Sequence, residues 1–245
     1  MFQSDGQINV TKKPFSKSGK NPNPRGQQKK KRVKTAKKRS HASTRWLQRQ
    51  LNDPYVAEAQ AQGYRSRAAF KLVQLDEQLN LIKKGQNIID LGAAPGGWTQ
   101  IIVDKVKPEE TGAKVVALDI LEMDELPGAI VLHMDFMDND APDKLKEAMD
   151  GEKADLVVSD IAPPTIGHKQ TDHLRIMALV EAAYYFAIEV LNPGGNFVAK
   201  VFQGGAENDL LADMRKNFAE VKHVKPDASR SDSSEIYVVG LGFRG

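Results

Sequence analysis

The chain has 245 residues, no cysteine and a formal net charge of +3. The absence of cysteine excludes disulfide scaffolds, thiolate metal sites and cysteine nucleophiles, and no apolar run approaches the roughly 20 residues that a membrane helix needs. The N-terminus lacks the apolar core of a secretory signal, so the sequence favours a cytoplasmic protein with no membrane partner.

The basic residues are concentrated at the N-terminus. The first 40 residues contain 13 Lys and Arg but a single acid, Asp5, which leaves 22 basic and 31 acidic residues in the rest of the chain. Residues 1–41 are poor in bulky apolar side chains, so we expect a disordered basic arm followed by one domain over residues 42–245. The arm could bind an RNA backbone through counterion release. A solubilising tail or a nuclear-import signal would have the same composition.

The remainder of the sequence predicts helices followed by alternating strands and helices. Between Ser43 and Leu81 apolar residues recur at helical spacing, which predicts two or three helices before the sheet. The expected strands cover residues 87–91, 114–119, 129–134, 155–159, 196–202, 221–224 and 236–241. The expected helices cover residues 98–106, 142–149, 173–191 and 209–218. This alternation indicates an α/β fold whose mostly parallel sheet carries helices on both faces.

A glycine-rich loop follows the first expected strand, in Asp90-Leu-Gly-Ala-Ala-Pro-Gly-Gly-Trp98. It lies at the carboxyl edge of the sheet, where open α/β sheets bind ligands. The loop lacks the Gly-Lys-Ser/Thr ending of a P-loop and the G-x-G-x-x-G spacing of a dinucleotide loop. S-adenosylmethionine fits better, because Gly96 and Gly97 permit close approach of the backbone to its amino-acid part.

Two acids end the next two expected strands. Asp119 lies about 20 residues beyond the loop, where an acid that reaches the ribose of a nucleoside cofactor is expected. Asp135 ends the third strand on the same edge, where an adenine amino group would need an acceptor. Either acid alone could be a turn residue or a helix cap, but three aligned strand ends favour a cofactor site.

The fourth and fifth strands supply the candidate catalytic groups. Asp160 follows strand four in Asp-Ile-Ala-Pro-Pro164, and Lys200 lies within the apolar strand Asn-Phe-Val-Ala-Lys200-Val-Phe. Most lysines in such strands extend to water. Desolvation, however, lowers a lysine pKa, and a positioned neutral amine can act as a general base near neutral pH.

From Ser43 onward, about four fifths of the chain resembles the bacterial heat-shock 23S ribosomal RNA uridine 2′-O-methyltransferases of the FtsJ/RrmJ type. The matching segments are Ser43-Thr-Arg-Trp-Leu-Gln, Arg65-Ser-Arg-Ala-Ala-Phe-Lys71-Leu, Asp90-Leu-Gly-Ala-Ala-Pro-Gly-Gly-Trp98, Ser159-Asp-Ile-Ala-Pro, Ala199-Lys-Val-Phe-Gln-Gly204 and Lys225-Pro-Asp-Ala-Ser-Arg230. The resemblance implies a Rossmann-like methyltransferase fold with seven strands, the last of them antiparallel. The chain departs from this family at Pro164, where relatives usually carry Asn.

The resemblance also assigns site residues. It implies that Lys71, Asp160, Lys200 and Glu235 are the catalytic set, with Lys200 as the general base. It implies that the S-adenosylmethionine contacts are Gly96, Trp98, Asp119, Asp135 and Asp160. In this interpretation Lys71 keeps Lys200 unprotonated by like-charge repulsion, while Asp160 and Glu235 orient the pair.

No metal is expected, because the positive charge of the cofactor dissipates as the methyl group leaves. His168 and His173 flank a loop and form no convincing ligand cluster. Arg65 and Arg67 are candidate RNA phosphate contacts, although both could be ordinary surface charges.

The resemblance implies large-subunit ribosomal RNA or the large ribosomal subunit as the partner, with a monomer favoured. The alternatives are a 2′-O-methyltransferase of transfer or messenger RNA, and a non-catalytic RNA-binding ribosome assembly factor. A base-amine methyltransferase is disfavoured because Asp160-Ile-Ala-Pro-Pro-Thr lacks an aromatic residue that would stack on a flipped base.

Overall fold

Three helices precede the sheet. The computed structural model describes residues 32, 35, 40–163, 167–202 and 208–245. The helices are α1 (His41–Asn52), α2 (Pro54–Gln62) and α3 (Ala69–Leu79), which confirms the expected N-terminal helices. Asp53 separates the first two: its carboxylate accepts a hydrogen bond from the Tyr55 amide and caps α2, while Pro54 occupies the first helical turn. Most of the arm that we expect to be disordered lies outside the described residues.

A seven-stranded sheet forms the centre of the molecule. Its strands are β1 (Ile88–Leu91), β2 (Val115–Asp119), β3 (Ile130–His133), β4 (Ala154–Ser159), β5 (Leu191–Phe202), β6 (Phe218–Val224) and β7 (Glu235–Phe243). They lie in the order β3-β2-β1-β4-β5-β7-β6. β7 alone runs in the opposite direction to the other six strands, and it pairs antiparallel with β5 and β6. The expected seven-stranded sheet with an antiparallel last strand is therefore confirmed.

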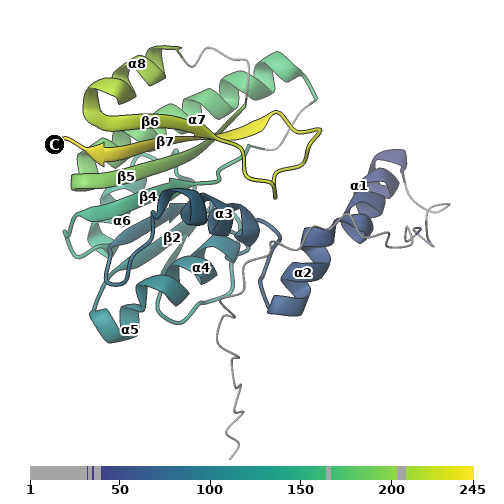
Figure 1. The fold of residues 1–245 in the computed structure, drawn as a ribbon, viewed down its shortest axis with the longest axis horizontal. Helices are drawn as coiled ribbons and strands as arrows, with labels where there is room; N and C mark the ends of the chain where they lie inside the picture. The colour runs from purple at the N-terminus through teal and green to yellow at the C-terminus, as the bar shows by residue number, and fades with distance from the viewer. Residues whose placement is uncertain (1–31, 33–34, 36–39, 164–166, 203–207) are drawn as a thin grey trace, which may run out of the picture.

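Helices cover both faces of the sheet and create two apolar cores. The intervening helices are α4 (Gly97–Val106), α5 (Pro108–Thr111), α6 (Ala141–Ala148), α7 (Lys169–Val190) and α8 (Asn208–Asn217). Alternate residues of a strand point to opposite faces. Val198 accordingly joins the core beneath α3 and α4, whereas Ala199 joins the core beneath α6, α7 and α8. Figure 1 shows α3 and α4 on the near side of the sheet and α7 behind it.

Two local features differ from the elements expected from the sequence. The short helix α5 was not predicted, because four residues between Pro108 and the left-handed Gly112 are too few to show a helical period. The Asn192–Gly195 segment lies outside the strand expected over residues 196–202, because its Pro and Gly residues are typical of a turn, but it is part of β5. The pairing of β4 with β5 shifts between Ala154 and Leu156, so the extra residues are accommodated as a bulge. No helix in the described part of the chain has the length and apolarity needed to cross a membrane.

Candidate active site

The strand register aligns the residues that sequence analysis singled out. Leu91 pairs with Leu118 on one side and with Ser159 on the other, so Gly92, Asp119 and Asp160 leave the sheet at one level. Ser159 also pairs with Ala199, which places Asp160 beside Lys200 on the neighbouring strand. The chain connections run in opposite directions on the two sides of β1, and such a switch point is where open α/β sheets bind ligands.

The glycine loop has the geometry of a binding loop. Gly92 has a φ of +78°, and a Cβ there would lie 2.7 Å from the backbone nitrogen of Ile161, so only glycine fits between the two strand ends. Gly96, with a φ of +101°, begins α4, and no side chain caps this helix. The first backbone N–H groups of α4 are thus free to bind an anionic ligand group.

Asp119 and Asp135 lie at the same edge and shape the loops around them. The Asp119 carboxylate accepts hydrogen bonds from the amides of Ala94 (2.8 Å) and Leu121 (2.8 Å). Asp135 accepts one from the Met137 amide (2.9 Å). A carboxylate offers about four acceptor positions, so each acid can still accept a hydrogen bond from a cofactor. The uncapped start of α4 and the glycine loop at this edge fit the nucleoside cofactor expected from the sequence.

The side chain of Trp98 does not face this edge. It is buried in the core beneath α3 and α4, and its indole N–H donates to the Ala68 carbonyl (2.7 Å). Trp98 is the second residue of α4, so its backbone amide is the group that it can offer to a cofactor.

A buried carboxyl lies beneath the glycine loop. Asp90 is fully buried, the Thr99 hydroxyl donates to its Oδ2 (2.7 Å), and its Oδ1 has no hydrogen-bond partner. Burial raises the pKa of Asp90 to about 7; the Thr99 bond opposes this rise, and the nearby charges of Asp160 and Asp119 add to it.

The four expected catalytic residues come together on the face of the sheet covered by α3. Lys200 shares the orientation of Val198, so it projects toward α3, which carries Lys71. The Lys200 ammonium lies 3.1 Å from Asp160 Oδ1 and donates to the Asp160 carbonyl (2.7 Å). Lys71 Nζ lies 2.7 Å from Glu235 Oε1 and 3.7 Å from Asp160 Oδ2. Asp160 therefore contacts both lysines.

The electrostatics of the cluster follow from this arrangement. Burial alone would raise the pKa of Asp160, but Lys200, Lys71 and the Tyr237 hydroxyl outweigh it and lower that pKa. Burial and the charges of Asp160 and Glu235 raise the pKa of Tyr237 well above its ordinary value. Asp160 is thus an anion and Tyr237 a neutral hydrogen-bond donor at neutral pH.

Tyr237 and Ser229 are members of the cluster that sequence reasoning missed. The Tyr237 hydroxyl donates to Asp160 Oδ1 (2.7 Å), the same oxygen that pairs with Lys200. The Ser229 hydroxyl donates to Glu235 Oε1 (3.0 Å). Tyr237 has the position of an ordinary buried strand residue, but its alternation with Glu235 in Glu-Ile-Tyr placed it on the same face, and that pattern could have identified it.

The two arginines expected to contact RNA have different surroundings. The guanidinium of Arg65 donates to the backbone carbonyls of Pro95 (3.4 Å), Asp124 (2.8 Å) and Glu125 (2.8 Å), so it holds the loops around Gly96. Arg67 pairs with Asp53 (3.1 Å) and donates to the Ala228 carbonyl. Only Arg67 lies in the groove described next.

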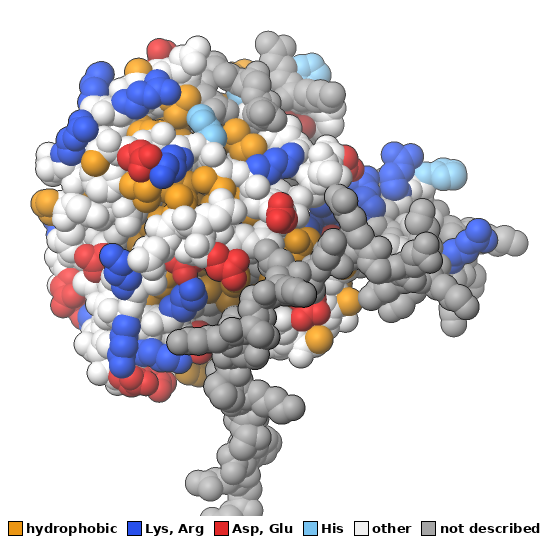
Figure 2. Space-filling model, viewed as in Figure 1, with side chains coloured by type: hydrophobic (Ala, Val, Ile, Leu, Met, Phe, Trp, Pro, Cys, Tyr) orange, Lys and Arg blue, Asp and Glu red, His pale blue; other side chains and the backbone are white. Residues whose placement is uncertain are grey.

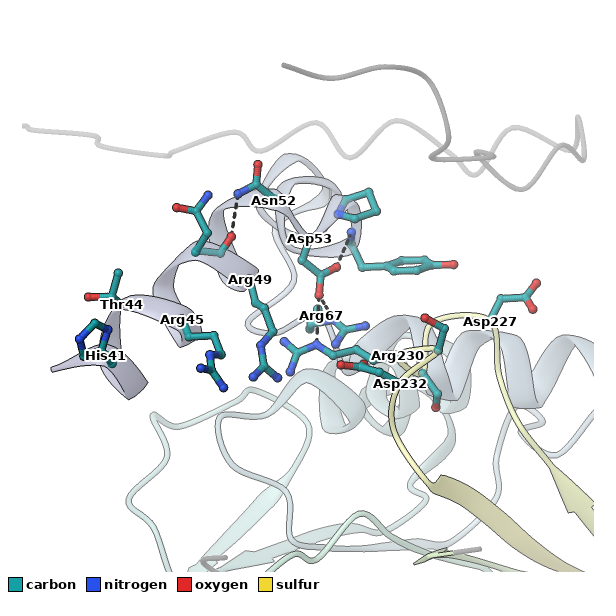
Figure 3. A pocket seen from close by; sticks show the side chains of 15 residues that line it. His41, Thr44, Arg45, Arg49, Asn52, Asp53, Arg67, Asp227, Arg230 and Asp232 are labelled. Atoms are coloured by element: carbon teal, nitrogen blue, oxygen red, sulfur yellow. Dashed lines mark hydrogen bonds and ion pairs between the residues drawn. The ribbon is translucent and has the colours of Figure 1, made fainter. Parts of the chain in front are cut away.

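A groove of about 960 Å³ runs between α1 and the loop that joins β6 to β7 (Figure 3). Four arginines and three aspartates line it: Arg45, Arg49, Arg67, Arg230, Asp53, Asp227 and Asp232. Ser229 lines it too, so the groove adjoins the cluster at Glu235. Figure 2 shows basic and acidic side chains interspersed over the body and basic side chains where α1 projects from it. Within the described residues, no three His, Asp or Glu side chains are placed to hold a metal ion.

Comparisons with known proteins agree on one family. The model of the FtsJ-like methyltransferases matches residues 64–243. A ribosomal RNA large subunit methyltransferase E from Paramagnetospirillum magneticum is 63% identical over 217 residues, covering 87% of this chain and 88% of the relative. The protein of that name from Novosphingobium aromaticivorans is 54% identical over 231 residues, covering 94% of this chain and 99% of the relative.

A solved structure shares the fold. The crystal structure of a Plasmodium falciparum protein described as a ribosomal RNA methyltransferase superposes with a TM-score of 0.65 at 34% sequence identity. The match covers 74% of this chain and 100% of that structure.

Proposed function

The chain belongs to the FtsJ-like methyltransferase family, and from this we propose that it methylates the ribose 2′-hydroxyl of a uridine in 23S ribosomal RNA. It is an RNA methyltransferase that uses S-adenosylmethionine. The observation that carries the specific reaction is the contact of Asp160 with both Lys200 and Lys71 beside the glycine loop. The names of relatives more than 50% identical support the ribosomal substrate.

The residues that would hold the cofactor lie along the carboxyl edge of the sheet. We assign its amino-acid part to the uncapped start of α4 at Gly96 and the Trp98 amide. We assign contacts with the cofactor ribose to Asp119 and contacts with its adenine to Asp135, and we place Asp160 near the methyl group. S-adenosylmethionine supplies an electrophilic methyl group bound to a sulfonium.

Lys200 is the proposed general base. A ribose hydroxyl is a poor nucleophile at neutral pH, so its proton must be removed as the oxygen attacks. Lys200 is 6% exposed, and a neutral amine at this position could accept that proton. Lys71 approaches the other oxygen of the same Asp160 carboxylate, so the two lysines are held in one cluster with the proposed base at its centre.

The remaining members of the cluster position this base. Asp160 fixes the Lys200 amine through both its carboxylate and its backbone carbonyl. Glu235 holds Lys71 and is itself held by Ser229. Tyr237 donates to Asp160 Oδ1, the oxygen that also contacts Lys200, and thereby fixes the orientation of this carboxylate. These contacts keep the Lys200 amine in place.

The substrate path follows from the position of the groove. Large-subunit ribosomal RNA would lie along Arg45, Arg49, Arg67 and Arg230, whose charges suit its phosphates. We extend the proposal to a cytoplasmic enzyme that acts as a monomer, with the basic arm of residues 1–41 as an additional RNA tether.

The decisive experiment is a map of ribose methylation in total RNA from cells with and without the protein. Loss of one 2′-O-methyl group from 23S RNA, restored by the wild-type gene but not by Lys200→Ala, is the expected result. Loss from transfer or messenger RNA would refute the ribosomal substrate. An unchanged map would instead support a non-catalytic assembly factor, and restoration by Lys200→Ala would refute Lys200 as the base.

A further inference from the structure

A single carboxylate holds two arginines together at the floor of the groove. Asp53 Oδ2 lies 3.1 Å from Arg67 Nε and 3.6 Å from Arg230 Nε. Figure 3 shows the two guanidinium groups converging on this carboxylate from the start of α3 and from the β6–β7 loop. One carboxylate between two guanidinium groups leaves a net positive charge at this point.

The contact with Asp53 leaves part of the hydrogen-bonding capacity of the arginines unused. Arg67 Nε is buried and forms no hydrogen bond, so its approach to Asp53 is a charge contact with poor alignment. Burial lowers the pKa of Arg67; Asp53 opposes this effect and Arg230 adds to it. A buried guanidinium beside a second one is stabilised most by an acceptor that can face both with aligned hydrogen bonds.

An RNA phosphate matches that requirement. It has more acceptor oxygens than one side of a carboxylate offers, and Arg pairs with phosphate in a bidentate geometry. Arg45 and Arg49, one helical turn apart on α1, line the same groove and provide contacts for neighbouring phosphates. The groove meets Glu235 through Ser229, so RNA bound there extends toward the catalytic cluster.

We propose that Asp53 acts as an internal stand-in for a substrate phosphate, which displaces it from Arg67 and Arg230 when RNA enters the groove. This inference rests on the proposed RNA methyltransferase function. The displaced carboxylate keeps its second role, because Asp53 Oδ1 caps α2 through the Tyr55 amide. Arg67 keeps the β6–β7 loop in place through the Ala228 carbonyl. In the free enzyme the Asp53 carboxylate thus masks the charges of two arginines. This contact lowers the affinity of the enzyme for RNA that occupies only part of the groove.

The test compares two substitutions that remove one negative charge from the same groove. Asp53→Asn preserves the helix cap, because Asn and Asp cap helices equally well, but it releases the arginines. Asp227→Asn is the matched control: Asp227 is exposed, lines the groove, and forms no ion pair among the described residues. Affinity for a fluorescent single-stranded RNA oligonucleotide is measured by anisotropy over a range of salt concentrations.

Asp53→Asn should bind the oligonucleotide about two- to fivefold more tightly than wild type, the range expected for a competing ion pair. Its salt slope should steepen by about one unit, as for one further phosphate contact. Asp227→Asn should gain less than about twofold. In an Arg230→Gln background the gain from Asp53→Asn should be clearly smaller, because one masked arginine is already absent.

Equal or weaker binding by Asp53→Asn than by Asp227→Asn would overturn the inference, as would a gain of undiminished size in the Arg230→Gln background. If Asp53→Asn does not fold, Asp53→Ser, which also caps a helix, answers the same question. Methylation of 23S transcripts by the wild-type enzyme is measured in parallel. Wild-type methylation with no gain from Asp53→Asn refutes only the displacement, whereas no wild-type methylation refutes the proposed function.

Discussion

Replacing Tyr237 by Phe removes one hydroxyl from the centre of the cluster and little else. The ring is fully buried, packs 5.6 Å from Trp98, and is isosteric with phenylalanine. Its hydroxyl donates to Asp160 Oδ1 at 2.7 Å, while Lys200 lies 3.1 Å from the same atom. Without the phenol, Asp160 loses a hydrogen bond that orients its carboxylate and helps to lower its pKa.

The expected magnitude follows from the strength of this hydrogen bond. A bond to an ionised partner contributes about 1.5–3 kcal/mol, and about 1.4 kcal/mol corresponds to a factor of ten in rate. Lys200 and Lys71 continue to stabilise Asp160, so we take the lower end of the range. We expect kcat at neutral pH to fall about tenfold, with cofactor affinity changed less than about twofold.

The assay is a pH profile of kcat with radiolabelled S-adenosylmethionine and a 23S transcript. The groups that face Asp160 are Lys200, Lys71 and Tyr237, and together they outweigh burial and lower the pKa of this carboxyl. Asp160 must stay ionised to hold both lysines, and its pKa rises when the phenol is removed, so Tyr237→Phe should move the acidic limb of the profile to higher pH.

Tyr184→Phe is the matched control. Tyr184 is also buried, and its hydroxyl donates to Asp213 (2.9 Å), but it lies in the opposite core. Both variants should lose about 1.5 kcal/mol of stability, and only Tyr237→Phe should change the profile. A wild-type profile for Tyr237→Phe would refute the role of the phenol, and a loss that is uniform across pH would refute its electrostatic part.

Three further predictions concern other parts of the molecule. Lys200→Ala should lower kcat by about 10³-fold or more while calorimetry still detects cofactor binding; near-normal turnover would eliminate it as the base. Burial raises the pKa of Asp90 to about 7, so the folded protein keeps this carboxyl protonated at pH values where the unfolded chain has lost the proton. The stability of the fold should therefore decrease as the pH rises from about 4 to 7, by up to about 4 kcal/mol. Urea unfolding should show Asp90→Asn gaining stability over wild type across that window, and a constant difference would contradict the assignment. Removing residues 1–40 should weaken RNA binding and flatten its salt dependence; an unchanged slope would exclude the arm as a tether.

The sequence predicted the layout of the sheet because each strand is a short apolar run bounded by turn residues. It did not predict that Asn192–Gly195 belongs to β5, since Pro and Gly in a row are typical of a turn. Only the shifted pairing with β4 shows that the segment is a bulge. Sequence alternation indicates the faces of a strand, but the register of its neighbours is a property of the assembled sheet.

The same distinction applies to the site. Lys71, Asp160, Lys200 and Glu235 were expected together because they lie in recognisable motifs, and the structure brings them into contact. Asp53 has the appearance of a helix cap before Pro54, and nothing near it in sequence indicates that Arg67 and Arg230 converge on it. Arg65, expected at a phosphate, donates instead to carbonyls 30, 59 and 60 residues away. Such long-range pairings have no local pattern.

The antiparallel last strand makes the cluster possible. In a fully parallel sheet only the carboxyl ends of strands meet at the ligand-binding edge. Because β7 runs the other way, its amino end lies at that edge, and Glu235 pairs with Phe202 while Tyr237 pairs with Lys200. A slip of one residue would turn both side chains to the opposite face. Because β7 is reversed, its Glu235 carboxylate and its Tyr237 phenol lie close to Lys200 on β5.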